Sequence, residues 1–408
     1  MNKEPRKMKL LKYFHKFNRH AKISFLAAGV LTLGAVSWSL VKTYGAVDGS
    51  AFRATPAVIS EPAKPKHIAT PDPVKAIYMT SWVAGTKEWR TDLVNFIKKS
   101  ELNSVVIDVK DYTGRISFDT GDASIKEMGS EEIRVKDMKD FMETLHDAGI
   151  YTIARITVFQ DPYYSKKYPE QAVQKKSGTL WKDKKGLSYI DPAALEFWDY
   201  TVRVAKASEK IGFDELNFDY IRFPSDGNMS DIIFPVSIKR NKVEVLSEFF
   251  AYLDSQLNNL PVPISADVFG MVTTNTDDLN IGQVLEQIAP HFDYIAPMVY
   301  PSHYPPTFQG FKNPATHPYE IVKFSMTRAV ERLILASSTP ASPTTSQGGP
   351  SKLRPWIQDF DLGATYDAEK VRAQIQAIYD SGLTSWMAWD AGNKYTRGAY
   401  EVVDNEAR

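Results

Sequence analysis

Cysteine is absent from the 408 residues of this chain. Its absence excludes disulfide bonds, thiolate metal sites and a cysteine nucleophile. An excess of charge of one sign is missing too, because 49 Lys and Arg residues balance 49 Asp and Glu residues. A general nucleic-acid binder needs a basic excess, so the zero net charge predicts no nucleic-acid partner. The hydrophobic content of 43% is typical of a globular protein.

Short motifs for metal, nucleotide or serine chemistry are missing as well. The histidines show neither H-x-x-x-H nor H-x-H spacing, which argues against a zinc site and leaves only a carboxylate site for Mg²⁺ or Ca²⁺ open. No G-x-G-x-x-G follows the first predicted strand, and neither a P-loop nor G-x-S-x-G occurs. We therefore predict no metal and no cofactor.

The N-terminal region is organised like a membrane anchor. Residues 1–22 carry eight Lys and Arg residues against the single acid Glu4, and the 19 residues 23–41 are uncharged and mostly apolar. A helix of that length spans about 28 Å, close to the hydrocarbon thickness of a bilayer. The basic flank predicts a single-pass anchor at the cell membrane with the rest of the chain extracytoplasmic. The alternative is a signal peptide cleaved near Gly49-Ser50-Ala51, which would release a secreted protein.

Residues 42–73 are rich in Pro and Ala and show no apolar period, which predicts a semi-extended linker. From residue 74 to about 400, short apolar runs alternate with helical patterns. This alternation predicts an α/β domain with a parallel sheet, and eight repeats favour a closed (β/α)₈ TIM barrel over an open doubly wound sheet. The predicted strands are 75–82, 104–110, 151–158, 214–221, 263–269, 293–300, 353–360 and 384–390.

Polar residues interrupt these strands near their C-terminal ends, the end that carries barrel active sites. Residues two apart on a strand share a face. If the apolar face meets the helices, the opposite face points into the barrel mouth. The residues expected there are Asp108 and Lys110 of the second strand, Arg155 of the third, Asn217 and Asp219 of the fourth, Asp267 of the fifth and Asp390 at the end of the eighth. The adjacent pair Asp219 and Asp267 is the candidate for two-carboxylate glycosidase chemistry.

Aromatic residues near the strand ends suit a carbohydrate ligand, because sugar rings present apolar C–H faces to aromatic side chains. The candidates for stacking are Trp82, Tyr300, Trp386, Trp389, Trp181 and Tyr189. Together with the polar residues of the mouth, they define a predicted substrate-binding set: Trp82, Asp108, Lys110, Arg155, Asn217, Arg222, Tyr300, Gln358, Trp389 and Asp390. The cations Arg155 and Arg222 are expected to keep Asp219 ionised.

Four sequence blocks resemble the signatures of a bacterial family of glycoside hydrolase domains of unknown specificity. They are GFDELNFDYIRFP at 212–224, ISADVFG at 264–270, IAPMVY at 295–300 and RPWIQDF at 354–360. The resemblance runs from about Lys75 to Tyr395 and implies a TIM-barrel glycosidase with Asp219 as nucleophile. In amylase-like relatives the acid/base follows on the fifth strand, which matches Asp267. In other relatives it lies on the sixth strand, where this chain has Tyr300 and no carboxylate.

The sequence thus predicts a membrane-anchored, extracytoplasmic glycoside hydrolase that cleaves a cell-envelope or environmental polysaccharide or oligosaccharide. Asp219 would attack or stabilise the anomeric carbon, and Asp267 would protonate the leaving oxygen. A non-catalytic glycan-binding or envelope scaffold module on the same barrel is the alternative. A transglycosidase or a deacetylase-like enzyme is a third reading, and the histidine spacing argues against the metal that a deacetylase would need.

Overall fold

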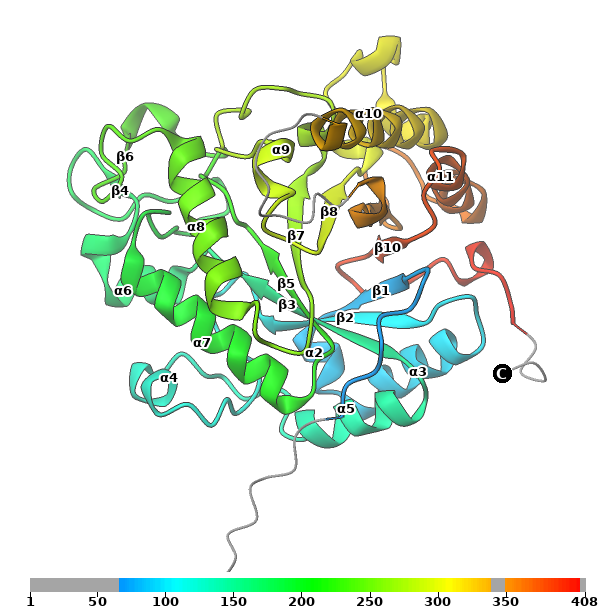
Figure 1. Cartoon of the computed structure of the whole chain (residues 1–408), viewed down its shortest axis with the longest axis horizontal. Coiled ribbons are helices and arrows are strands. Elements are labelled where there is room, and N and C mark those ends of the chain that lie inside the picture. Colours follow the sequence, from blue (N-terminus) through cyan, green and yellow to red (C-terminus); the bar gives the residue numbers. More distant parts are fainter. Residues whose placement is uncertain (1–65, 339–348, 404–408) are drawn as a thin grey trace, which may run out of the picture. The chain divides into compact units, whose positions relative to one another are not determined.

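A closed barrel of eight parallel strands forms the centre of the computed structural model, which describes residues 66–338 and 349–403. Around the barrel the strand order is β1-β10-β9-β8-β7-β5-β3-β2 (Figure 1). This arrangement confirms the predicted eight-stranded parallel barrel. The strands are β1 (Lys75–Met79), β2 (Ser104–Lys110), β3 (Tyr151–Thr157), β5 (Glu215–Asp219), β7 (Ile264–Phe269), β8 (Tyr294–Met298), β9 (Trp356–Gln358) and β10 (Trp386–Trp389).

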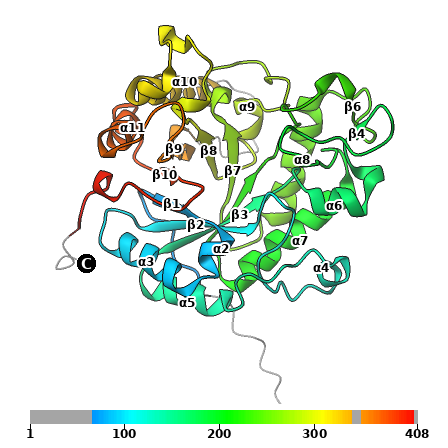
Figure 2. The ribbon, with the colours of Figure 1, turned by 180° about the vertical axis from the view of Figure 1, so that it is seen from behind.

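Helices connect successive strands and cover the outside of the barrel, as the alternating pattern predicts. In both ribbon views α7 and α8 lie side by side on the outside of the barrel (Figures 1 and 2). The helices are α2 (Ser81–Ala84), α3 (Lys87–Lys98), α4 (Ala123–Met128), α5 (Met138–Asp147), α6 (Pro162–Lys167), α7 (Leu195–Ile211), α8 (Lys242–Leu257), α9 (Leu285–Ile288), α10 (Pro318–Ser338) and α11 (Ala368–Asp380). Short 3₁₀ turns occur in the connecting loops.

The two faces of each strand meet different surroundings. Leu216 and Phe218 of β5 point outward and pack against the buried apolar residues of the helices. The opposite face of β5 carries Glu215, Asn217 and Asp219, which are buried inside the barrel. Buried polar groups are costly unless they find partners, so this strand requires a polar network within the barrel.

The helix-to-strand transition before β5 depends on glycine. Gly212 ends α7 with φ of 118°, a left-handed conformation that a residue with a side chain adopts only under strain. A Cβ at this position would also lie 3.3 Å from Cβ of Met142. Gly212 therefore turns the chain directly from α7 into the strand that carries Asp219.

A small lobe that the sequence did not predict lies within the long loops after β3 and β5. It contains the antiparallel pair β4 (Gln174–Lys175) and β6 (Ile232–Ile233), seen together at one edge of Figure 1. Trp181 and Tyr189 are buried with Val173 in the core of this lobe. The expectation that these two aromatic residues face a sugar is therefore wrong. Trp386 also points outward, where its indole N–H donates to the hydroxyl of Tyr379.

The last residues of the predicted linker are attached to the barrel. The backbone N–H of Ile68 donates to Asp214 Oδ1 over 3.0 Å, and Ile68 packs against the apolar residues inside the barrel. Residues 1–65, which include the predicted basic segment, the predicted span 23–41 and most of the linker, lie outside the described residues. Within the described ranges, no helix is both long enough and apolar enough to cross a bilayer.

An irregularity in β2 changes the direction of Lys110. Asp108 pairs with Arg155, but Lys110 pairs with Ile156, because the register shifts between the two β2 residues. Lys110 therefore lies on the outward side with Ile156, where its buried ammonium group pairs with Asp161 at 2.8 Å and donates to the Thr157 carbonyl at 2.6 Å. The expectation that Lys110 faces the barrel mouth is wrong, since alternation along a strand fails at such a bulge.

Replacing Lys110 tests the structural role of this ion pair. Lys110→Met leaves the buried carboxylate of Asp161 without its cation, which should lower the free energy of unfolding by about 3 kcal/mol. Urea denaturation measures the change. Lys126→Met is the matched control, because Lys126 pairs with Asp119 on the solvent-exposed surface and its loss should leave the midpoint unchanged. Equal midpoints for the two variants would contradict the assignment.

Candidate active site

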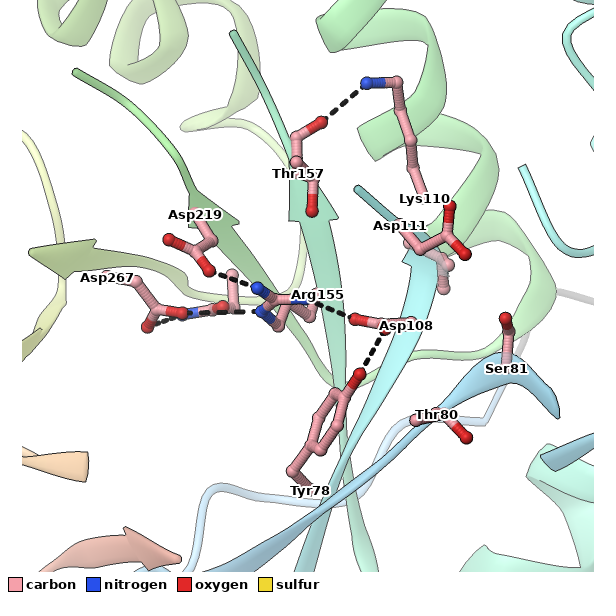
Figure 3. A network of polar contacts seen from close by, with 12 residues as sticks. Tyr78, Thr80, Ser81, Asp108, Lys110, Asp111, Arg155, Thr157, Asp219 and Asp267 are labelled. Atoms are coloured by element: carbon pink, nitrogen blue, oxygen red, sulfur yellow. Dashed lines mark hydrogen bonds and ion pairs between the residues drawn. The ribbon is translucent and has the colours of Figure 1, made fainter. Parts of the chain in front are cut away.

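Four ionisable side chains from neighbouring strands meet at the C-terminal mouth of the barrel. Asp108, Arg155, Asp219 and Asp267 come from β2, β3, β5 and β7, which are consecutive in the barrel. Figure 3 shows Arg155 between Asp108 on one side and the two other carboxyl groups on the opposite side. The strand alternation in the sequence predicted this gathering.

The guanidinium of Arg155 contacts all three carboxyl groups. Nη1 lies 2.6 Å from Asp108 Oδ1, Nη2 donates to Asp219 Oδ2, and Nε lies 3.8 Å from Asp267 Oδ2. Burial alone would lower the pKa of Arg155, but the charges of Asp219 and Asp108 raise it well above its ordinary value. Arg155 is therefore a permanent cation at the centre of the mouth.

Asp219 is held at both carboxyl oxygens. Oδ2 accepts from Arg155, and Oδ1 accepts the backbone N–H of Tyr220 at 2.6 Å. Tyr220 has φ of 54°, a left-handed conformation that costs a residue with a side chain about 1–2 kcal/mol. Such strain is often found at functional sites. The turn after β5 thus orients Asp219 while Arg155 supplies its counter-charge.

Asp267 lies beside Asp219 but has different partners. Phe218 of β5 pairs with Ala266 of β7, and the two aspartates are the next residues on their strands. Asp219 and Asp267 therefore lie at the same height in the barrel wall. Asp267 Oδ1 accepts from Asn217 Nδ2 at 2.9 Å and from Trp356 Nε1 at 2.8 Å. Burial, together with the nearby charge of Asp219, raises the pKa of Asp267 to about 8. Burial therefore favours the protonated form of Asp267.

Asp108 and an aromatic cluster support the other side of Arg155. The hydroxyl of Tyr78 donates to Asp108, and burial raises the pKa of Asp108 even though Arg155 opposes that shift. Trp389 stacks on Tyr78 with ring centroids 3.8 Å apart, and its ring lies 4.9 Å from the Arg155 guanidinium carbon. Trp356 meets Trp389 edge-on at 5.6 Å. These rings fix Arg155 from the β1 and β10 side of the mouth.

Sequence reasoning missed Tyr78 and Trp356 as members of this site. Each has an aromatic ring and a hydrogen-bond donor on the inward face of its strand. The alternation of inward and outward side chains along β1 and β9 could have predicted that both residues face into the barrel. Their carboxylate partners lie 30 and 89 positions away in the sequence, so only the folded barrel shows these contacts.

Some predicted binding residues reach the mouth and others serve the loops. Tyr300 lies two residues after the end of β8, and burial together with the charges of Asp267 and Asp219 raises its pKa well above the ordinary value. Gln358 is fully buried, accepts the Ser302 N–H at 3.1 Å and donates to the carbonyl of Phe360 at 2.9 Å. Gln358 thus joins the loops after β8 and β9 and offers little to a ligand.

Arg222 and Asp390 do not join the Arg155 cluster. Arg222 Nη1 donates to the carbonyl of Phe223 and to Ser225, both at 3.1 Å. The structure thus gives no support for Arg222 as the counter-ion of Asp219, because the turn after β5 directs its side chain to its own loop. Asp390 accepts the backbone N–H groups of Gly392 and Lys394, so it shapes the loop after β10.

Metal ligands do not gather in the part of the chain that the structure describes: no group of three or more His, Asp or Glu side chains there could hold an ion. The side chains that meet at the mouth are the carboxyl groups, the guanidinium and the amide, phenol and indole groups around them.

Comparison with known families decides the class of protein. A family described as "Putative glycosyl hydrolase domain" matches residues 76–395, most of the described barrel. The chain belongs to this family. The predicted family and the predicted glycoside hydrolase class are thereby confirmed, without a specificity. A search of curated proteins finds no match to this chain.

Three solved structures illustrate what this chain is similar to. A hypothetical protein from Ruminiclostridium thermocellum ATCC 27405 is 34% identical, with 47% of this chain and 97% of that chain covered and a TM-score of 0.43. The PgaB (BpsB) glycoside hydrolase domain from Bordetella bronchiseptica is 13% identical, covers 81% of this chain and 100% of its own, and has a TM-score of 0.56. The α-L-fucosidase isoenzyme 2 from Paenibacillus thiaminolyticus is 10% identical, with coverages of 80% and 48% and a TM-score of 0.52. At 13% and 10% identity, the last two likenesses concern the fold alone.

Thermal stability should distinguish the two carboxyl groups. The folded-state pKa of Asp267 lies above its ordinary value, so its contribution to stability is complete at low pH and is lost as the pH rises toward 8. Asp267→Asn mimics the protonated acid, with one acceptor oxygen and one donor, and needs no proton. We expect its melting temperature to exceed that of the parent more at pH 8 than at pH 5.

Asp219→Asn is the comparison variant for this measurement. It removes a negative charge from the buried pair with Arg155, which should lower the melting temperature at both pH values. If Asp267→Asn lowers the melting temperature more than Asp219→Asn at pH 8, then Asp267 is ionised in the folded protein. The claim that Asp267 is the protonated member of the two neighbouring aspartates would then be wrong.

Proposed function

We propose that this chain hydrolyses glycosidic bonds of a cell-envelope or environmental polysaccharide by a two-carboxylate mechanism. The observation that carries the proposal is the contrast between two adjacent carboxyl groups. Asp219 is paired with a permanent cation, whereas burial raises the pKa of Asp267 and favours its protonated form. A pair of carboxyl groups in such different environments suits one nucleophile and one general acid. Membership of the glycosyl hydrolase family supports this assignment.

The reaction can be followed proton by proton. Asp267 gives its proton to the glycosidic oxygen as the bond from that oxygen to the anomeric carbon breaks. Asp219 attacks the anomeric carbon or stabilises its positive charge. A water molecule then adds to the anomeric carbon, any bond between Asp219 and that carbon breaks so that Asp219 leaves as a carboxylate, and the Asp267 carboxylate takes up the proton that this water loses. The hydrolysis therefore needs no further reactant.

The surroundings of Asp267 favour its role as acid. When Asp267 loses its proton, the donors Asn217 and Trp356 already point at Oδ1, and Arg155 Nε lies 3.8 Å from Oδ2. Hydrogen bonds and a nearby cation stabilise the charged form of a carboxyl group. Burial thus keeps the proton on Asp267 before the reaction. When Asp267 gives this proton to the leaving group, its new negative charge already has hydrogen-bond donors.

We propose further that residues 23–41 anchor the protein in the cell membrane with the barrel outside. The basic residues 1–22 and the length of the uncharged stretch support this location. The polysaccharide substrate of such a protein would be a component of the envelope or of the surroundings of the cell. Cleavage near residue 50 and secretion of the barrel is the alternative.

Glycan binding without cleavage is the second candidate function. The observation that favours it is that Asp219 and Asp267 are only 3% and 2% exposed and that Asp219 is already paired with Arg155. A closed pair of this kind could contribute to a binding surface without reaching a glycosidic bond. The two functions differ in whether sugar products form.

Hydrolysis by the full-length chain tests the proposal. The protein is incubated with a panel of soluble α- and β-linked polysaccharides and isolated cell-wall glycan, and new reducing ends are measured. We expect release from one substrate, with kcat at least about 100-fold lower in Asp219→Asn and in Asp267→Asn. Asp140→Asn, on the exposed surface of α5, is the matched control and should keep full activity. Binding without product, or full activity in both site variants, would contradict the mechanism.

The pH profile tests the acid separately. Because protonated Asp267 is the active form, kcat/KM should fall as the pH rises through about 8. Trp356→Phe removes a donor to the charged form of Asp267, so this alkaline limb should move up by about one pH unit. Trp386→Phe removes an indole donor outside the barrel mouth and should leave the limb in place. If kcat/KM falls at the same alkaline pH in both variants, a group other than Asp267 is titrating.

A further inference from the structure

Trp82 is an exposed aromatic residue on the rim of the barrel mouth. It is the second residue of α2, which begins two residues after the end of β1. Its relative exposure is 59%, although most large aromatic side chains of the described barrel are buried.

One face of the Trp82 indole is supported by the side chain of Arg134. The guanidinium carbon lies 4.5 Å from the centre of the ring, a cation–π contact. The side chain of Arg134 is only 5% exposed and is held in place, since it donates to Asp111, to Ser81 Oγ at 3.0 Å and to Glu132 at 3.0 Å. The ring therefore rests on a fixed base, and a ligand that binds its other face need not order the side chain first.

The backbone keeps this support close to α2. Gly85 follows the helix, and a Cβ at this position would lie 2.3 Å from the carbonyl oxygen of Arg134. Only glycine allows the segment around Arg134 to approach α2 so closely. The position of Trp82 is thus set by the packing of two segments that are far apart in the sequence.

The supported ring belongs to the same rim as the candidate active site. Ser81 and Asp111, which bind Arg134, lie beside the Tyr78–Asp108–Arg155 contacts in Figure 3. Around the barrel, β2 and β3 separate the strand before Trp82 from β5 and β7, which carry Asp219 and Asp267. A sugar on Trp82 would therefore be a different unit of the chain from the sugar that is cleaved.

We propose that the free face of Trp82 binds a hexopyranose ring of a glycan at a subsite removed from the cleaved bond. The substrate is then a polysaccharide or long oligosaccharide bound along the rim, and not a short glycoside. This inference rests on the proposed function, because it assumes that the mouth takes a glycan. The charge of Arg134 is balanced by Asp111 and Glu132, which suits the apolar face of a neutral sugar better than an anionic group.

Binding by the full-length Asp267→Asn protein tests the subsite without cleavage of the probe. The probes are cellohexaose, chitohexaose and maltohexaose with their disaccharides, and calorimetry measures each Kd. For the hexasaccharide that binds best, we expect Trp82→Ala to raise Kd about tenfold, and Trp82→Phe, which keeps a ring, to raise it less. The Kd of the matching disaccharide should change less than twofold. Trp89→Ala is the control, because Trp89 is equally exposed, at 63%, but lies on α3.

The possible outcomes separate this inference from the proposed function. An unchanged hexasaccharide Kd in Trp82→Ala overturns the subsite, as does an equal loss for the disaccharide or a failure of every hexasaccharide to bind. A melting temperature equal to that of the parent shows that the variant is folded, which the exposure of Trp82 leads us to expect. If the wild-type protein releases no product but Trp82→Ala still weakens hexasaccharide binding, the subsite stands and the hydrolytic mechanism fails.

Discussion

The guanidinium of Arg155 contacts three carboxyl groups inside the barrel, and the arrangement of the mouth depends on these contacts. Without a cation, several buried carboxyl groups could not lie so close together in ionised form. Arg155 binds Asp108 and Asp219 directly and reaches toward Asp267 at a longer distance. The pairing in the barrel wall places these four residues on consecutive strands, so the closed sheet and the charge cluster support each other.

The unequal distances from Arg155 give the two neighbouring aspartates different properties. Asp219 has a close cation, whereas Asp267 receives two neutral donors and is buried near a negative charge. The pKa of Asp267 is raised for that reason, with burial as the main cause. In the proposed mechanism, these unequal surroundings let one fold supply a nucleophile and a general acid side by side, the combination that glycoside hydrolysis requires. Stability and function oppose each other at Asp267. An asparagine amide at this position would need no proton to be buried, but it could not act as the acid.

Much of the fold could be predicted from the sequence, because the period of two in the strands and of 3.6 in the helices is local information. The same alternation predicted that Asp108, Arg155, Asp219 and Asp267 face inward. It failed at Lys110, where a register shift in β2 reversed the side chain. The separate expectation for the loop residues Trp181 and Tyr189 failed because it rested on aromatic composition, which cannot show that a loop has its own core. The contacts of Tyr78, Trp356 and Arg134 join distant segments, and no local pattern contains them.

The protonation state of Asp267 is the most direct test of this account. Carbon-13 NMR of the full-length chain with labelled Asp carboxyl groups would report it across a pH titration. We expect a carboxyl signal with the chemical shift of a protonated acid at pH 7, which titrates near pH 8 and is absent from Asp267→Asn. A spectrum in which Asp267 is already ionised at pH 7 would contradict the central claim that the two neighbouring aspartates differ in charge.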